Sequence, residues 1–297
     1  MELNQLKTFI TIAKAGSFTK AAEVLDYAQS SVSGQIKALE DEFETRLFER
    51  LGREVTLTED GRRLLDHAEQ LLKLAEETRE SVSSRSVPKG TLVIGAPESI
   101  CIFRLPPLLQ EYRKRYPNVK LVLKQGSCGD TYSWLQKNLI DLAFLLDTPI
   151  DISAFVIRPL TKEPTTVIAS VNHPLLAKGT VESRDFAGED LILIEEDGCY
   201  RRAFENQLAE SGVQPGSVQE FGSVELIKKC VASGLGISIL PQIAVKKEIA
   251  DGELADLHWR AQDFNIYTQM LYRKDKWLSP ALSAMIELAK EQNGKLS

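Results

Sequence analysis

Residues 1–60 carry three short apolar periodicities of helical spacing, separated by turn residues instead of long loops. The spacing predicts helices over residues 3–15, 18–25 and about 30–42. Gly16 ends the first helix, and the hydroxyl of Ser17 is placed to cap the second. Short helices joined by a tight turn form a helix-turn-helix, whose second helix can enter the major groove of DNA.

Charge is distributed unevenly along this segment. The whole chain has a net charge of −6, and residues 1–60 hold seven Lys or Arg against eleven Asp or Glu, a net of −4. Nucleic-acid binders often carry a basic excess, so any DNA-binding face must be local. Residues 27–39 contain no carboxylate, and the acidic run begins only at Glu40. The side chains of residues 1–60 that can reach bases or phosphates from this stretch are Gln29, Ser30, Ser31, Ser33, Gln35 and Lys37, and Ser17 is added from the start of the second helix.

A short hairpin is predicted after the third helix. Residues 47–50 and 55–58 fit a two-stranded wing with Gly52 at its tip, which places Arg50 and Arg53 beside phosphates. On spacing alone, a small helical domain with a solvated polar face explains the segment equally well, because helix-turn-helix shapes also occur in proteins that bind no DNA.

The segment resembles the N-terminal signature of LysR-type transcriptional regulators. The matching positions are Ala15, Gly16, Ser17, Phe18, Ala21, Ala22, Leu25, Gln29, Ser30, Ser33, Ile36, Leu39, Glu40, Leu47, Phe48, Glu49, Arg50, Leu57, Thr58 and Gly61. The resemblance implies that Gln29, Ser30, Ser31 and Ser33 face DNA, with Arg50 and Arg53 on the wing. Gly34 departs from the family, which often has arginine there. Its presence should remove one contact and weaken the helix by up to about 1 kcal/mol.

A heptad seam follows on one long helix predicted over residues 59–85, which leads to a hinge over residues 81–90. The residues that form the seam are Leu64, Ala68, Leu71, Ala75, Thr78 and Val82. A single helix would leave this stripe in water, so a partner is expected, and the family resemblance implies a homodimer or homotetramer. A dimer also suits DNA, because two recognition helices can read two half-sites. The alternative is a helix packed on its own domain.

Beyond residue 90 the pattern changes to alternating strands and helices, which predicts parallel sheets covered by helices. One series has strands at 91–95, 120–123 and 141–146, with helices starting near Phe103 and around 132–138. A second series has strands at 166–169, 191–194 and 237–240. A strand at 268–272 and a helix at 280–290 are expected to return to the first series.

The resemblance extends to this part, which looks like a periplasmic-binding-protein-like (type 2) effector domain. The expected fold class is an α/β effector domain of two Rossmann-like lobes, preceded by an all-α winged helix-turn-helix and a long linker helix. The expected boundaries are 1–58 for the winged helix-turn-helix, 59–88 for the linker and hinge, and 89–297 for the effector domain, with lobe I at 89–161 and 267–297 and lobe II at 162–266.

Ligands of open α/β sheets bind at the carboxyl ends of strands, near helix N-termini that favour anions. Three segments meet that description, at 97–100, 126–129 and 198–201. In the family, positions matching Ser99 and either Ser127 or Cys128 line the effector cleft. The candidate effector-binding residues are Ser99, Ile100, Ser127, Cys128, Cys199, Arg201 and Ser223, and the expected ligand is an anionic metabolite. Each of these residues could instead be a helix cap or a loop residue.

Cys199 allows a second interpretation. Peroxide-sensing members of the family carry a reactive cysteine in a stretch that resembles residues 196–199, and a helix N-terminus beside Arg201 and Arg202 could lower the pKa of the thiol. Such sensors need a resolving cysteine about nine residues later, and that place holds Leu208. A small buried or pocket-lining thiol is therefore favoured.

Several classes of function are not indicated. The sequence shows no secretory signal, no transmembrane run and no paired CxxC, and the four cysteines are expected to be free thiols without zinc. It also lacks GxSxG, HExxH and a phosphate-cradling glycine loop, so neither an enzyme nor a cofactor is expected. The carboxylates at 195–197 are interpreted as an exposed turn. The prediction is a cytoplasmic, ligand-responsive regulator with double-stranded DNA and RNA polymerase as partners. The competing hypothesis is a solute-binding protein with an unrelated helical module, which a signal peptide would have favoured.

Overall fold

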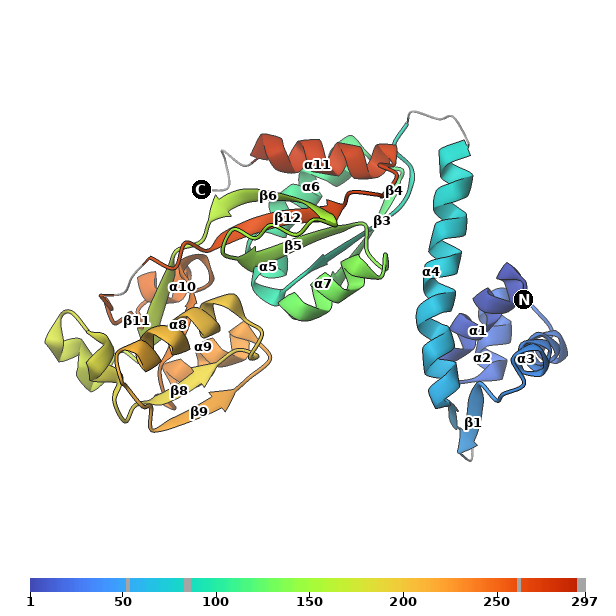
Figure 1. Cartoon of the computed structure of the whole chain (residues 1–297). Helices are drawn as coiled ribbons and strands as arrows, with labels where there is room; N and C mark the ends of the chain where they lie inside the picture. The colour runs from blue at the N-terminus through green and yellow to red at the C-terminus, as the bar shows by residue number, and fades with distance from the viewer. Residues whose placement is uncertain (52–53, 83–86, 261–262, 293–297) are drawn as a thin grey trace. The chain divides into compact units, whose positions relative to one another are not determined.

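The computed structural model describes residues 1–51, 54–82, 87–260 and 263–292. The chain divides into two compact units, Met1–Arg85 and Ser86–Ser297, each with its own apolar core (Figure 1).

The first unit confirms the predicted helices and wing. Its elements are α1 (Leu3–Ala15), α2 (Phe18–Leu25), α3 (Gln29–Phe43), β1 (Phe48–Leu51), β2 (Glu54–Leu57) and α4 (Glu59–Val82). Gly16 ends α1 in the left-handed region at φ 62°, and its N–H donates to the carbonyl of Ile12. The Ser17 hydroxyl accepts from the N–H of Lys20 at 3.4 Å, as expected for the cap of α2.

The core of the first unit fixes the direction of the third helix. Val32, Ile36 and Leu39 of α3 are buried, so the opposite face of this helix is turned to solvent. Phe48 of the wing packs its ring against Phe9 at 5.2 Å between centroids, which ties the hairpin to the helices. The wing and α3 are therefore held by one core.

The apolar stripe of α4 is used in two different ways. Ala68 is fully buried in the core of the first unit, and Leu64 packs against that core. Part of the alternative interpretation, a helix packed on its own domain, therefore holds for these two residues. Further along, Leu71 is 38% exposed and Val82 is 78% exposed, while Ala75 is half-buried. The second half of the stripe thus has apolar surface that the described residues of its own unit leave exposed.

Lobe I of the second unit contains a five-stranded sheet in the order β4-β3-β5-β12-β6. The first three strands are parallel, and β12 runs antiparallel to both β5 and β6, so the final strand returns to the first series as predicted. Its elements are β3 (Gly90–Ala96), α5 (Glu98–Phe103), α6 (Leu105–Arg115), β4 (Val119–Gln125), α7 (Cys128–Gln136), β5 (Leu142–Asp147), β6 (Phe155–Lys162), β12 (Tyr267–Arg273) and α11 (Pro280–Gln292). The helix expected near Phe103 is α6, which starts at Leu105, and a short helix that the sequence did not predict, α5, precedes it directly after β3.

Lobe II departs from the expected repeat of a parallel sheet. β8 and β9 are parallel, but β10 and β11 both pair antiparallel with β7. β7 follows β6 after only two residues, Glu163 and Pro164, but lies in a different sheet. The elements are β7 (Thr165–Ala169), the short 3-10 helices η1 (Pro174–Lys178) and η2 (Ser183–Phe186), β8 (Asp190–Leu193), α8 (Cys199–Glu210), β9 (Ser217–Glu220), α9 (Val224–Ala232), β10 (Ser238–Pro241), α10 (Gln242–Ala250) and β11 (Ala255–Asp256).

Two chain crossings join the lobes, from β6 into β7 and from lobe II back into β12 (Figure 1). Glu163 lies at the first crossing, where its buried carboxylate accepts two bonds from the Arg104 guanidinium at 2.7 Å each. It also accepts from the hydroxyl of Thr268 on β12 at 2.6 Å. One carboxylate therefore links the two crossing strands to the α5–α6 junction.

Candidate functional site

The exposed face of α3 carries most of the predicted DNA contacts. Gln29, Ser30, Ser31 and Lys37 are exposed, and the side-chain amide of Gln29 donates to the hydroxyl of Ser33 at 3.3 Å. These side chains lie away from Val32 and Ile36, which point into the core. The α3 face therefore presents amide, hydroxyl and ammonium groups to solvent, which is the chemistry that reads base edges and phosphates.

Two predicted contacts have roles inside the unit. Gln35 is half-buried, and its amide oxygen accepts from the hydroxyl of the fully buried Thr8 at 2.6 Å. Ser17 caps α2. Arg53 lies outside the described residues, and for Arg50 only the backbone, in β1, is described.

Gly34 lies within the exposed face of α3. A Cβ built at this position would meet no atom within 4 Å. The space that a longer side chain would fill is therefore open, and the glycine leaves a gap among Ser30, Ser33 and Lys37.

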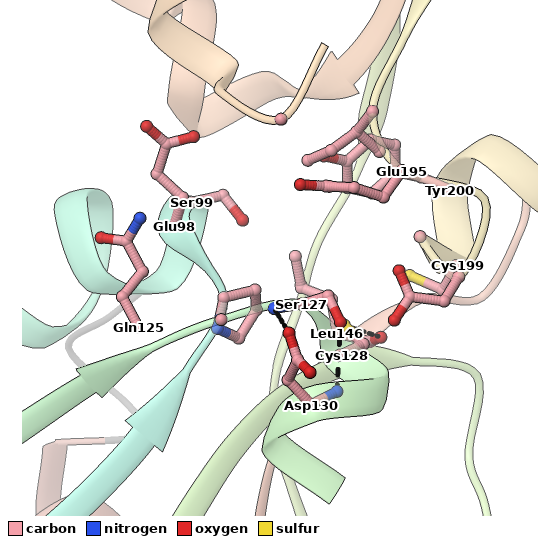
Figure 2. Close-up of a pocket in the computed structure, with 16 residues that line it drawn as sticks. Glu98, Ser99, Gln125, Ser127, Cys128, Asp130, Leu146, Glu195, Cys199 and Tyr200 are labelled. Atoms are coloured by element: carbon pink, nitrogen blue, oxygen red, sulfur yellow. Dashed lines mark hydrogen bonds between the residues drawn. The ribbon is translucent and has the colours of Figure 1, made fainter. Parts of the chain in front are cut away.

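A cavity of about 360 Å³ lies in the second unit, at the carboxyl ends of strands from both lobes. Figure 2 shows Glu98 and Ser99 on one side of it, Ser127 and Asp130 below, and Glu195, Tyr200 and Cys199 opposite. The segments that follow β3, β4 and β8 therefore meet here, as the sequence predicts. The lining residues are Pro97, Glu98, Ser99, Gln125, Gly126, Ser127, Cys128, Asp130, Leu146, Ile194, Glu195, Asp197, Gly198, Cys199, Tyr200 and Gly222.

Four of the predicted effector-binding residues line this pocket, namely Ser99, Ser127, Cys128 and Cys199. The other three do not belong to its lining.

Ile100 is 1% exposed and belongs to the apolar core. Ser223 caps α9 and donates its hydroxyl to Glu98 at 2.9 Å. Arg201 is buried, and its guanidinium bonds Glu205 at 3.0 Å and Glu220 at 2.7 Å. The arginine thus serves lobe II itself.

The sequence did not predict that carboxylates of residues 195–197 line the pocket. The cluster at 195–197 was interpreted as an exposed turn, but only Glu196 is exposed, whereas Glu195 and Asp197 line the pocket. Their signal was their place directly after the strand β8, in the same loop that the sequence selected for Cys199.

Carboxylates cross the pocket and cap helices of the opposite lobe. Asp197 of lobe II accepts from the N–H of Gly129, in the first turn of α7 in lobe I, at 2.6 Å. Glu98 of lobe I accepts from the N–H of Val224, the first residue of α9 in lobe II, at 2.5 Å. A carboxylate at a helix N-terminus satisfies free N–H groups and the helix dipole. The two lobes are therefore held together by a reciprocal pair of caps.

The two pocket cysteines have the character of protonated thiols. Burial raises the pKa of Cys128 to about 12, and burial, together with Cys128 and Asp147, raises the pKa of Cys199 well above its ordinary value. Arg202 acts in the opposite direction, but its effect on Cys199 is smaller. Because the thiolate is the reactive form, this environment favours a pocket-lining thiol over a peroxide sensor.

Two family models together match almost the whole chain. "Bacterial regulatory helix-turn-helix protein, lysR family" covers residues 3–62, and "LysR substrate binding domain" covers residues 85–294. The uncharacterized HTH-type transcriptional regulator YwqM of Bacillus subtilis is 42% identical over 98% of this chain and 99% of its own length.

Solved structures of LysR-type regulators are similar to this chain over almost its whole length. A full-length OxyR variant from Pseudomonas aeruginosa has a TM-score of 0.71 and 26% identity, covering 99% of this chain and 94% of that one. Full-length CbnR in complex with its target DNA has a TM-score of 0.70 and, at 21% identity over 98% of this chain and 99% of that one, shares the fold.

A helix-turn-helix with a wing, followed by a two-lobed α/β domain, defines a regulator that couples a DNA-binding unit to a ligand-binding unit. The chain belongs to the LysR family of transcriptional regulators and is a DNA-binding transcriptional regulator. In the part of the chain that the structure describes, no helix is both long and apolar enough to cross a membrane.

Proposed function

We propose that this regulator acts as a homo-oligomer whose operator binding responds to a small molecule held between the lobes of its second unit. The pocket carries the proposal, because its lining comes from segments of both lobes at the carboxyl ends of their strands. Its volume of about 360 Å³ lies within the range of ligand pockets, near the lower end. A ligand there would contact Glu98 and Asp197, the residues that already join the lobes.

The α3 face reads DNA in this proposal, with Gln29, Ser30, Ser31, Ser33 and Lys37 as its contacting side chains. The wing arginines Arg50 and Arg53 remain predicted phosphate contacts. A regulator of transcription of this kind works in the cytoplasm with RNA polymerase, and no catalytic step is assigned to it.

A pocket-filling variant tests the response without knowledge of the ligand. A Cβ at Gly222 would lie 3.1 Å from the carboxylate of Glu195, so Gly222→Leu places a bulky side chain in the pocket. The variant is expected to bind operator DNA in vitro but to hold a reporter at one level across growth media that change the wild-type level. A variant with the full wild-type response would contradict control through this pocket.

The Lys37→Ala variant tests the DNA face. The ammonium of Lys37 is exposed on α3, so its loss should weaken operator binding and lower the slope of log affinity against log salt by about 0.9. Mobility-shift titrations at several salt concentrations, with DNA from upstream of the gene, measure both effects. Lys7→Ala is the matched control, because it removes the same charge from an exposed site on α1. Equal losses for both variants would count against a specific role of α3.

The Leu71→Asp variant tests the oligomer. Leu71 exposes 38% of its surface on the half of the α4 stripe that its own unit leaves uncovered. A charge there should shift the mass measured by analytical ultracentrifugation from dimer or tetramer toward monomer at micromolar protein. Glu76→Gln, on an exposed position of the same helix, should leave the mass unchanged. An unchanged mass for Leu71→Asp would remove α4 from the interface.

A further inference from the structure

The interlobe pocket has an unusual charge for a site expected to take an anion. Four of its 16 lining residues are carboxylates, namely Glu98, Asp130, Glu195 and Asp197, and no Lys, Arg or His occurs among the described residues that line it. An anion placed there would face like charges at short range, which disfavours binding. The lining therefore opposes the anionic ligand expected from the sequence.

The nearest arginines do not offset this charge. Arg201 donates to the carbonyl of Ile194 at 2.5 Å and to the carboxylates of Glu205 and Glu220. Arg202 donates to the carbonyl of Asp197 at 2.5 Å and lies 3.8 Å from the carboxylate of Asp147. Both guanidinium groups are therefore engaged by the protein's own oxygens.

Two helix N-termini beside the pocket already hold carboxylates of the chain. Asp197 occupies the N–H of Gly129 in α7, and Glu98 occupies the N–H of Val224 in α9. Asp130 accepts from the N–H of Ser127 at 3.2 Å. The N–H groups of Gly129 and Val224 are therefore already bound to carboxylates of the chain, which places negative charge at two helix N-termini beside the pocket.

Glu195 is the carboxylate that lacks such a partner. Apart from its own backbone amide, no described group bonds its side chain, which is half-buried beside Gly222. Burial raises its pKa, and the neighbouring charges of Asp197, Glu220 and Glu98 raise it further. A positively charged partner would relieve both effects.

A buried hydroxyl beside it also lacks a partner. Tyr200 is 3% exposed and lines the pocket, yet its hydroxyl makes no hydrogen bond among the described residues. Burial raises its pKa, followed by the effects of Cys199, Cys128, Glu195 and Glu98, all of which line the same pocket. The hydroxyl is thus buried, without a described partner, on a residue that lines the pocket. Buried polar groups of this kind are normally paired, so a ligand atom is expected to complete it.

We propose that the ligand of this pocket is a small organic molecule with a protonated amine, which donates to the carboxylate of Glu195 and to the hydroxyl oxygen of Tyr200. The inference rests on the proposed function, because it names the chemical class that the same pocket takes. An ammonium group is a donor without acceptors, and it matches a site that offers acceptors without cations. Among the described residues no group of three or more His, Cys, Asp or Glu side chains fits a metal ion, so the positive charge is assigned to an organic cation.

Thermal unfolding of the full-length protein with matched compounds tests the class. The probes are putrescine, the neutral L-amino acids and their amides, each amino acid paired with the carboxylic acid of the same skeleton that lacks the amine. Ligand binding to the native state raises the melting temperature by mass action. At least one amine is expected to raise the Tm, and its partner acid without the amine is not. Comparing diamines, amino acids and amides shows whether the amine belongs to a cation or to a zwitterion.

Three variants locate the contact. Glu195→Gln should weaken the apparent affinity for the active amine at least tenfold. Glu196→Gln makes the same change at the next residue, which is exposed and outside the pocket lining, and should leave the affinity unchanged. Tyr200→Phe should weaken binding without lowering the Tm of the ligand-free protein, because the hydroxyl that it removes has no partner to lose.

Failure of the amine proposal is distinguishable from failure of the proposed function. The amine proposal is overturned if no amine raises the Tm, or if Glu195→Gln retains the wild-type affinity. If the acids without amines raise the Tm and change operator binding, the pocket is an effector site of another class. If Gly222→Leu keeps the full wild-type reporter response, control through the pocket fails, whatever binds there.

Discussion

Gly61→Ala is expected to unfold the DNA-binding unit or to displace its wing, with loss of operator binding. A Cβ at Gly61, in the first turn of α4, would lie 2.1 Å from the backbone carbonyl oxygen of Leu47. That oxygen cannot move freely, because it accepts from the N–H of Thr58 at 3.1 Å, and the Thr58 hydroxyl is bonded to the carbonyl of Arg46 at 2.7 Å. Overpacking against fixed backbone should cost at least about 2 kcal/mol.

Gly34→Ala is the matched control for this prediction. It makes the same substitution inside a helix of the same unit, but its Cβ would meet nothing within 4 Å. It should stabilise the unit by about 0.4–1 kcal/mol, because alanine reduces the conformational freedom of the unfolded chain. Far-UV circular dichroism during urea unfolding follows both variants. All three tryptophans, Trp134, Trp259 and Trp277, belong to the second unit, so an unchanged tryptophan transition confines the effect to the first. A Gly61→Ala protein as stable as wild type would contradict the close approach.

Glu163→Ala is expected to destabilise the second unit by about 3–5 kcal/mol. The Glu163 side chain is 2% exposed, and its removal takes from Arg104, 13% exposed, both oxygens of a bidentate ion pair. The hydroxyl of Thr268 loses its acceptor in the same substitution. Removing one partner of a buried pair is costly because the other charge stays buried. Since Glu163 joins the crossing strands β6 and β12, the loss should appear as a lower urea midpoint of tryptophan fluorescence.

The neighbouring Lys162 provides the comparison. Lys162 pairs with Asp263, and both side chains are largely exposed at 47% and 63%. Exposed pairs contribute at most about 1 kcal/mol, so Lys162→Ala should change the midpoint little. Similar midpoints for Lys162→Ala and Glu163→Ala would mean that the Glu163 contacts add no stability at the crossing.

Local sequence signals were sufficient for the DNA-binding unit. Gly16 and Ser17 mark a helix end and a helix start through backbone conformation and capping, and both act within a few residues along the chain. The apolar spacing of Val32, Ile36 and Leu39 determines which face of α3 is buried and hence which face is free to meet DNA. Gln35 shows the limit of such reasoning, because its bond to Thr8 spans 27 residues.

The linker helix and lobe II show which features local sequence patterns do not determine. The stripe on α4 is continuous in sequence, yet Ala68 is buried against its own unit while Val82 is largely exposed. Periodicity specifies an apolar face but not which surface covers it. In the same way, apolar runs located β7 and β10 but did not determine that these two strands pair antiparallel.

The sequence by itself determined the recognition helix and the three loops that meet at the pocket, because capping, helical spacing and strand ends are local properties. Only the tertiary structure decided the charge of that pocket. Glu98 and Asp197 reach helices of opposite lobes. Among the described residues, the Glu195 side chain is bonded only by its own backbone amide, and the Tyr200 hydroxyl has no partner. Whether a polar side chain is engaged depends on groups that lie far away along the chain. This is why the sequence located the loops that line the pocket but not which of its polar side chains are engaged.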